Sequence, residues 1–154
     1  MPKARAKKKR SAASKPLTPA ETESLVRAAT AARELAYAPY SNFSVGAAVL
    51  FADGEVVTGC NVENASYGLT ICAERAAIFR GVAMGKKAIR AVCVVAESMD
   101  PTAPWVGPCG ACRQVIFEFG ADAWIVLATA GREGCVVTRI GELLPRAFGP
   151  STLG

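Results

Sequence analysis

The spacing of apolar residues divides the chain into segments with helical periodicity and segments with short, continuous apolar runs. The first helix is predicted over 18–36, where a threonine, a proline and a glutamate form a capped start. Further helices are predicted over 71–84 and 109–119, with a short last one over 140–144. In the first helix the apolar residues recur at helical intervals: Leu25, Val26, Ala29, Ala32 and Leu35.

Strands are predicted between these helices, because the apolar runs there are short and bounded by turn residues. The segments 43–51 and 55–60 flank Ala52-Asp53-Gly54, a sequence typical of a hairpin turn. The runs 88–96 and 124–128 are almost continuously apolar, as buried central strands are. A last strand is predicted over 135–138.

The order of elements, αββαβαββα, predicts an α/β fold. We expect three layers, α/β/α, with helices on both faces of a mixed five-stranded sheet. The two middle βα units should place their strands parallel, through right-handed crossovers, and the first hairpin should add antiparallel strands.

The positive charge of the chain is concentrated at its N-terminus. Seven of the 18 lysine and arginine residues fall within the first 15 positions, where no acidic residue occurs. The remainder carries 11 basic and 13 acidic residues, so the body is mildly acidic. Residues 1–16 are therefore predicted to be a disordered basic tail, followed by one domain at 17–154. A solubilising extension is favoured over a nucleic-acid contact, because no aromatic residue interrupts the run.

Long apolar runs are missing from the sequence. None approaches the roughly 20 residues of a membrane span, and no apolar segment follows the basic N-terminus as in a secretory signal. We therefore expect a cytoplasmic protein without membrane contact.

The cysteine and histidine content limits the chemistry. The chain has six cysteines and no histidine. Without a secretory signal, the cysteines indicate metal binding or catalysis rather than disulfides. The missing histidine excludes histidine general bases, histidine-based nucleophilic relays and histidine metal ligands.

Cys109-Gly110-Ala111-Cys112 is a CxxC motif at a predicted helix start. It is compatible with a redox pair, with half of a structural zinc site, or with a catalytic zinc site that has three protein ligands. The motif comes late in the chain, which disfavours the redox pair, and a second CxxC for a structural site does not exist. Cys72, at another helix start, is the best candidate for a third ligand, because parallel βα units bring their helix starts together. Three other cysteines fit buried structural thiols: Cys60, Cys93 and Cys135.

Glu74 follows Cys72 by two positions, in the first turn of the same predicted helix. A carboxylate beside a catalytic zinc site is suited to move protons between water and substrate. The alternative is an ordinary first-turn glutamate that complements the helix dipole. The neighbouring ligand candidates favour the catalytic interpretation.

Several stretches of the chain resemble the small, homotetrameric cytidine deaminases. Cys72-Ala73-Glu74 followed by Pro108-Cys109-Gly110-Ala111-Cys112 is similar to the zinc deaminase signature. The likeness covers about residues 18–150 and is carried by five segments: 39–48, 59–67, 71–75, 108–115 and 142–150.

That resemblance implies a function and a set of roles. Zn²⁺ would be held by Cys72, Cys109 and Cys112, with Glu74 as general acid and base. The reaction would be hydrolytic deamination of cytidine and 2′-deoxycytidine to uridine and 2′-deoxyuridine, in pyrimidine salvage. The remaining residues implied to contact the substrate are Phe43 on the pyrimidine, Asn61 and Glu63 on the ribose, Ala73, and Tyr67 and Phe148, the last from an adjacent subunit.

Three thiolates carry more negative charge than Zn²⁺ neutralises, so positive charge is expected near the sulfurs. Arg75 and Arg113 are the full charges closest to the ligands in sequence. We hypothesise that Arg75 donates a hydrogen bond to a ligand sulfur.

Three other functions remain open from the sequence. One is deamination of another cytosine-containing compound, such as blasticidin S. A second is editing of a base within RNA, which the acidic body argues against. The third is a structural zinc module that binds nucleic acid through the tail.

Overall fold

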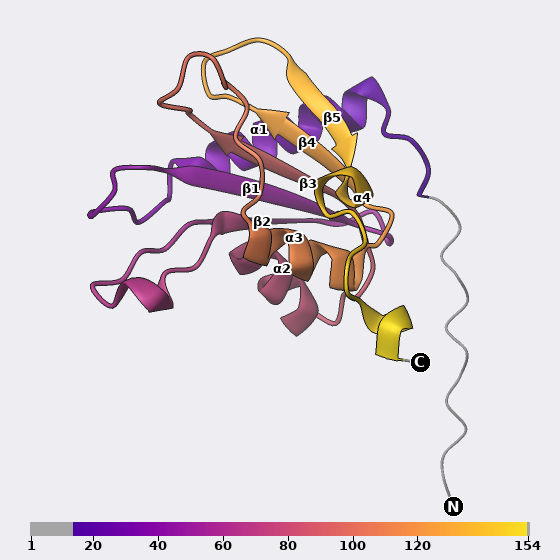
Figure 1. Cartoon of the computed structure of the whole chain (residues 1–154). Helices are drawn as coiled ribbons and strands as arrows, with labels where there is room; N and C mark the ends of the chain where they lie inside the picture. Colours follow the sequence, from indigo (N-terminus) through magenta and orange to yellow (C-terminus); the bar gives the residue numbers. More distant parts are fainter. Residues whose placement is uncertain (1–13, 154) are drawn as a thin grey trace, which may run out of the picture.

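The computed structural model describes residues 14–153 and contains one mixed five-stranded sheet in the order β2-β1-β3-β4-β5 (Figure 1). The strands are β1 (Val45–Phe51), β2 (Val56–Cys60), β3 (Ile89–Ala96), β4 (Trp124–Ala128) and β5 (Cys135–Arg139). The helices are α1 (Pro19–Arg33), α2 (Ala73–Ala83), α3 (Gly110–Phe119) and α4 (Ile140–Leu143), with 3₁₀ turns η1 (Tyr67–Leu69) and η2 (Pro150–Leu153).

The strand directions agree with the predicted fold. β1 pairs antiparallel with β2 and with β3, β3 pairs parallel with β4, and β5 returns antiparallel to β4. Gly54 adopts φ +90° in the β1–β2 turn, a conformation that glycine reaches without strain. β2, β3 and β4 therefore run in one direction, and their carboxyl ends lie at one edge of the sheet.

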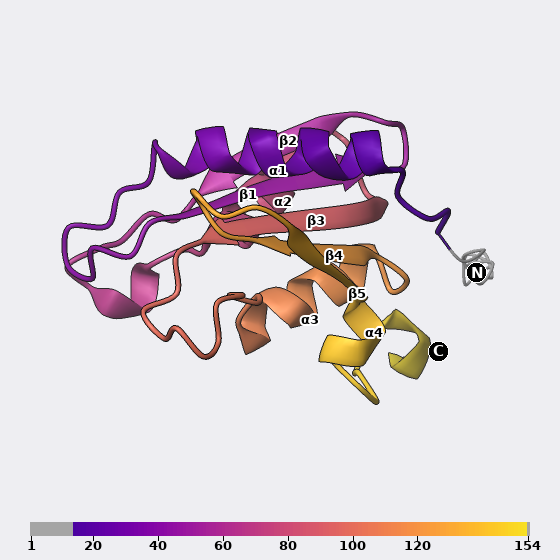
Figure 2. The ribbon, with the colours of Figure 1, turned by 90° about the horizontal axis from the view of Figure 1, so that it is seen from above.

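Helices cover both faces of the sheet, which gives the three predicted layers (Figure 2). α1 packs on one face, where its Leu25 and Ala29 join the buried side chains of one apolar cluster. α2 and α3 contribute Ala77, Ile78 and Ile116 to a second cluster on the opposite face. This second face carries the helix starts with the candidate ligands.

A close approach of α2 to β2 depends on Gly59. A Cβ atom there would lie 2.5 Å from the backbone nitrogen of Ala77 and 2.7 Å from the carbonyl oxygen of Ala73. Any side chain at this position would push the first turn of α2, and Cys72 with it, away from the sheet.

The element ends differ slightly from the predictions. α1 ends at Arg33 and α2 begins at Ala73, because Cys72 has extended backbone angles and serves as the N-cap. The sequence did not indicate η1 and η2, which are too short to show a helical period.

The predicted tail, 1–16, lies mostly outside the described residues. Its last three residues contact the body. The Trp124 indole donates to the carbonyl of Lys15, Arg139 donates to Ser14, and Arg90 donates to the carbonyl of Pro16. Residues 14–16 thus contact side chains of β3, β4 and β5.

Within residues 14–153, none of the helices combines the length and the apolar character that crossing a bilayer requires.

Candidate active site

Three sulfurs meet where α2 and α3 begin. Cys72 and Cys109 are the N-cap residues of these helices, and Cys112 lies in the first turn of α3. Their Sγ atoms lie within 4.8 Å of one another, and those of Cys72 and Cys109 are 3.8 Å apart. The two helices follow β2 and β3, whose carboxyl ends share one edge of the sheet. The parallel direction of these strands therefore brings together ligands that are distant in sequence.

Positive charge is present at the sulfurs. Arg75, in the first turn of α2, donates from Nη2 to Cys72 Sγ over 3.5 Å, which is the type of contact hypothesised from the sequence. A hydrogen bond with Cys112, and then the Arg75 guanidinium, lower the pKa of the Cys72 thiol to about 5. The thiolate at Cys72 in turn raises the pKa of Cys112. Of these two thiols, Cys72, beside the arginine, therefore ionises more readily than Cys112.

Glu74 is a buried acid beside this cluster. Only 3% of its surface is exposed, whereas glutamate is seldom buried without a function or a partner. Burial raises the pKa of its carboxyl, and the negative charge at Cys72 raises it further. A raised pKa suits a carboxyl that must both take up and release a proton, as a general acid and base does.

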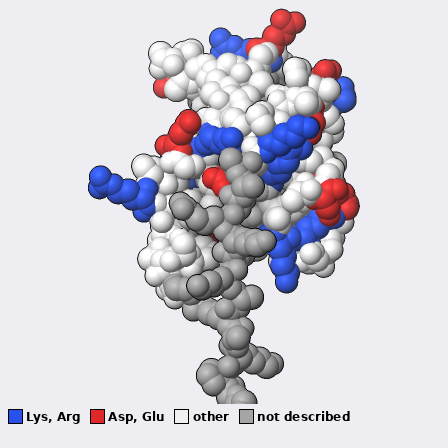
Figure 3. Space-filling view, turned by 90° about the vertical axis from the view of Figure 1, so that its right-hand side faces the viewer, with Lys and Arg blue, Asp and Glu red and all other residues white. Residues whose placement is uncertain are grey.

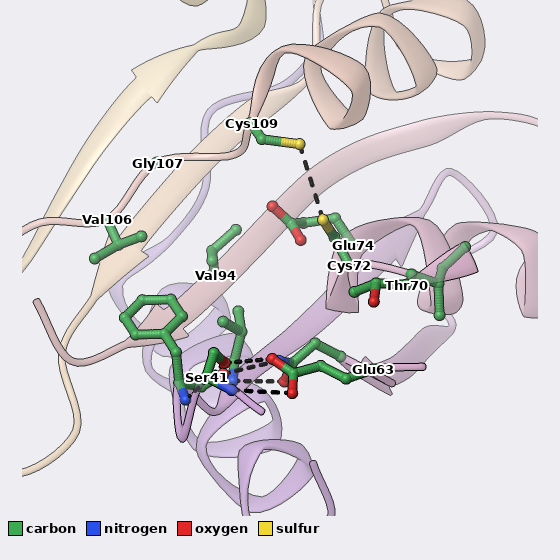
Figure 4. A pocket seen from close by; sticks show the side chains of 13 residues that line it. Ser41, Glu63, Thr70, Cys72, Glu74, Val94, Val106, Gly107 and Cys109 are labelled. Atoms are coloured by element: carbon green, nitrogen blue, oxygen red, sulfur yellow. Dashed lines mark hydrogen bonds between the residues drawn. The ribbon is translucent and has the colours of Figure 1, made fainter. Parts of the chain in front are cut away.

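A pocket of about 440 Å³ extends from the sulfurs along the carboxyl edge of the sheet. Cys72, Cys109 and Glu74 lie at one end, and Ser41 and Glu63 lie at the other (Figure 4). Phe43 and Asn61 also line it, so the candidate residues from four separate segments share one cavity.

Asn61 is 8% exposed, and its carboxamide forms hydrogen bonds with the backbone of the segment that leads into β1. Its Oδ1 accepts from the Val45 amide and its Nδ2 donates to the Phe43 carbonyl, both over 2.8 Å. One N–H and one lone pair of the amide remain for a ligand.

Glu63 is held by the turn that precedes Phe43. Its carboxylate accepts from the amides of Tyr40 and Ser41 over 2.8 Å and 3.2 Å, and from the Ser41 hydroxyl. These donors, with the Ser41 hydroxyl first, lower the pKa of the Glu63 carboxyl. Glu63 is therefore ionised at neutral pH and faces the pocket as an acceptor.

Six of the predicted site residues lie outside the pocket lining. Two of them, Cys112 and Arg75, belong to the sulfur cluster, and the other four are Tyr67, Ala73, Arg113 and Phe148. Tyr67 is 74% exposed and packs edge-on against Tyr40, and Phe148 is 58% exposed. The Ala73 side chain is buried in the apolar cluster under α2. Arg113 donates to the carbonyls of Pro108 and Leu143, so it braces the backbone before Cys109 instead of bonding a sulfur.

Sequence reasoning missed part of the lining. Ser41, Thr70, Val94, Val106 and Gly107 all contribute to the pocket. Ser41 stands in the segment 39–48 that resembles the family, two positions before Phe43, so the sequence indicates a hydroxyl close to that ring. Thr70, Val106 and Gly107 enter from loops and Val94 from β3, and no residue pattern in the sequence indicates that they line a pocket.

The cysteine cluster fits zinc by the chemistry of its donors. Three thiolates are soft ligands that select zinc over the hard cations, and three protein ligands are the number that a catalytic zinc site uses. Glu74, buried beside them, is not among the ligating set.

Comparison with known proteins also indicates a zinc-binding site. A family model described as "Cytidine and deoxycytidylate deaminase zinc-binding region" matches residues 19–128. The chain belongs to the cytidine and deoxycytidylate deaminase family.

Individual members of the deaminase family match almost over their full length. The cytidine deaminase of Sporosarcina psychrophila is 44% identical over 86% of this chain and 95% of its own. That of Halalkalibacterium halodurans is 47% identical over 83% of this chain and 94% of its own. The crystal structure of the cytidine deaminase from Burkholderia pseudomallei has 48% identity and a TM-score of 0.74, and covers 86% of this chain and 100% of that one. These matches bear out the predicted family, the fold and the zinc dependence.

Proposed function

We propose that this chain hydrolyses the amino group of cytidine and 2′-deoxycytidine, giving uridine or 2′-deoxyuridine and ammonia. The observation that carries the proposal is the buried Glu74 carboxyl beside three convergent sulfurs, in a pocket whose other end presents Asn61 and Glu63. The curated relatives at 44% and 47% identity are cytidine deaminases.

The metal end of the pocket would carry out the chemistry. Cys72, Cys109 and Cys112 would hold Zn²⁺, which supplies Lewis acidity and a water of lowered pKa. Glu74 takes a proton from the attacking water and gives it to ring N3 as the oxygen bonds to C4. Glu74 then passes the second proton to the exocyclic nitrogen, the C4–N bond breaks, and ammonia leaves. One carboxyl serves both steps because it is base and acid in turn.

The other end of the pocket would recognise the nucleoside. Phe43 stacks on the pyrimidine, and the free N–H and lone pair of Asn61 suit a ribose hydroxyl. Glu63, ionised and with acceptor capacity remaining, takes a hydrogen bond from a sugar hydroxyl.

The proposal includes a homotetramer with shared sites, acting in the cytoplasm in pyrimidine salvage. The exposed rings of Tyr67 and Phe148 support shared sites, because a neighbouring subunit would cover them. Ala73 would contact the substrate through its backbone, since its side chain is buried. Light scattering on the purified protein tests the tetramer, and a monomer with full activity would contradict it.

Turnover of pure nucleosides tests the reaction. Loss of cytidine absorbance and release of ammonia should be rapid with cytidine and 2′-deoxycytidine, and should stop when a chelator removes zinc. Restoring Zn²⁺ should restore the rate. Absence of turnover by a protein that retains zinc would overturn the proposal.

Blasticidin S is a second candidate substrate. The blasticidin-S deaminase of Bacillus cereus is 31% identical over 108 residues and matches across 76% of its own length. The Asn61 and Glu63 pair favours a nucleoside with sugar hydroxyls. Faster turnover of blasticidin S than of cytidine would reverse this preference.

The face drawn in Figure 3 does not favour action on RNA. Where grey atoms do not cover it, lysine and arginine side chains lie among aspartate and glutamate side chains. A variant lacking residues 1–13 should therefore keep full cytidine turnover. Loss of cytidine turnover in this variant would show that the basic N-terminus takes part in the reaction.

A further inference from the structure

The segment before β1 makes a tight turn around the Glu63 carboxylate. The amides of Tyr40 and Ser41 both donate to Glu63 Oε2, and the Ser41 hydroxyl donates to Oε1. Asn42 adopts φ 55°, in the left-handed region, which asparagine tolerates better than most residues. The carboxylate thus organises the turn that delivers Phe43 to the pocket.

The Ser41 hydroxyl connects the two sides of this arrangement. Its Oγ accepts from the Phe43 amide over 3.0 Å while its proton goes to Glu63. The Phe43 carbonyl is held from the other direction by Asn61 Nδ2 over 2.8 Å. The backbone of Phe43 is therefore fixed at its N–H by Ser41 and at its C=O by Asn61.

We propose that Ser41 is a positioning residue, whose hydroxyl holds the base-stacking Phe43 and the sugar-binding Glu63 in one fixed relation. The inference rests on the proposed function for the roles of those two residues. Ser41 lies at the opposite end of the pocket from the sulfurs and Glu74 (Figure 4), so it acts on nucleoside binding and not on proton transfer.

Loss of the hydroxyl affects two groups together. The Phe43 amide loses its acceptor, and Glu63 keeps only the two backbone donors. Hydrogen bonds to a charged group are among the stronger ones in proteins, so a rise in KM of about tenfold is expected. kcat should change by less than about twofold, because a loss confined to ground-state and transition-state binding alike raises KM alone.

Ser41→Thr and Ser41→Val form the matched pair for the test. The two side chains have nearly the same shape and differ by one hydroxyl. Ser41→Thr should keep the wild-type KM for cytidine, and Ser41→Val should show the rise. Ser24→Ala, on the exposed side of α1, serves as the control for an unrelated lost hydroxyl.

Three further measurements distinguish a positioning role of Ser41 from general damage to the fold. The penalty of Ser41→Val should shrink on 2′,3′-dideoxycytidine, which lacks the hydroxyls that Glu63 would bind. It should also be smaller in a Glu63→Gln background, because the two changes act on one hydrogen-bonded unit. Hydrogen exchange at the Phe43 amide should be faster in Ser41→Val than in Ser41→Thr, whatever the activity.

Failure of the proposed function and failure of the Ser41 proposal give different results in these experiments. If wild-type protein with zinc neither binds nor converts cytidine, the proposed function fails, and amide exchange still decides whether Ser41 holds Phe43. If cytidine turns over and the Thr and Val variants have equal KM, the positioning role is wrong. An equal fall in kcat with unchanged KM would also contradict it.

Discussion

Glu63 and Glu74 line the same pocket in opposite environments. Glu74 is buried among thiols and apolar side chains, and burial raises its pKa. Glu63 is surrounded by three hydrogen-bond donors from one turn, which lower its pKa. In the proposed function, one residue type thus serves as a proton carrier at the metal end of the pocket and as a fixed anion at the sugar end. The contrast between the two glutamates shows that burial and local hydrogen-bond donors, rather than residue type, set the direction of each pKa shift.

Replacement of Glu74 should produce the largest effect. Glu74→Gln keeps the size of the side chain and removes the proton carrier, so kcat should fall by about 10²–10⁴-fold. Zinc content, by elemental analysis, should stay at the wild-type value, because Glu74 is not a ligand. Glu118→Gln, on the exposed side of α3, is the matched control and should retain full turnover. Comparable turnover in both variants would remove Glu74 from the mechanism.

Arg75→Gln tests the electrostatics of the metal end. The guanidinium donates to Cys72 Sγ, and partners of metal ligands typically contribute about 10–100-fold in metal affinity or activity. Zinc should transfer to a chelator faster, and kcat should fall. Arg27→Gln, whose side chain is 72% exposed on α1, should change neither quantity. Unchanged zinc content and turnover in Arg75→Gln would show that the contact is incidental.

Glu63→Gln tests the sugar end and should leave the chemistry nearly intact. A neutral amide at this position cannot accept from the Tyr40 and Ser41 donors with the same strength, and it binds a sugar hydroxyl less tightly. KM for cytidine should rise about tenfold while kcat changes little. Steady-state kinetics of Glu63→Gln beside Glu74→Gln would then separate the two ends. A kcat loss as large as that of Glu74→Gln would erase the distinction.

The smallest expected effect is a pH dependence of the folding stability. Glu21, whose pKa is strongly lowered, is the carboxyl with which Glu63 is compared. A hydrogen bond from Arg90 lowers the pKa of Glu21 to about 2 from an ordinary value of 4.5, whereas Glu63 has its largest contribution from a neutral hydroxyl. NMR titration should place both carboxyls below 4.5. Each folded-state pKa lies below the unfolded value, so each contributes stability that is complete above pH 4.5.

The same sign predicts how stability changes on acidification. The Glu21 contribution should disappear as the pH falls from about 4.5 toward 2. Urea unfolding of wild type and Glu21→Gln should therefore differ near neutral pH and converge near pH 2. Curves that differ equally at both pH values would exclude the ionised pair as the cause.

Local pattern predicted most of the fold. The order of elements, the hairpin at Ala52-Asp53-Gly54 and the mixed sheet follow from spacing and turn residues, which act over a few positions. The family also came from the sequence, through the resemblance of five segments to the cytidine deaminases. The missing histidine and the late CxxC pointed separately to a zinc site built from cysteines.

The hydrogen-bond partners of the two arginines near the sulfurs could be known only from the tertiary structure. Arg75 and Arg113 each lie three positions or fewer from a ligand cysteine, yet Arg75 donates to sulfur and Arg113 to two carbonyls. Their partners come from how α2, α3 and the C-terminal segment pack, which no local pattern records. The docking of residues 14–16 onto Trp124, Arg139 and Arg90 has the same origin.

The sequence by itself determined which groups are available: three thiols, one acid two positions from the first of them, and the carboxamide and carboxylate proposed to bind a sugar. Only the tertiary structure decided how those atoms are held, with Glu74 buried, Glu63 enclosed by the turn at Ser41, and Phe43 fixed between Ser41 and Asn61. The physical reason is that ligand type depends on residue chemistry, whereas burial and hydrogen-bond partners depend on contacts between segments far apart in the chain.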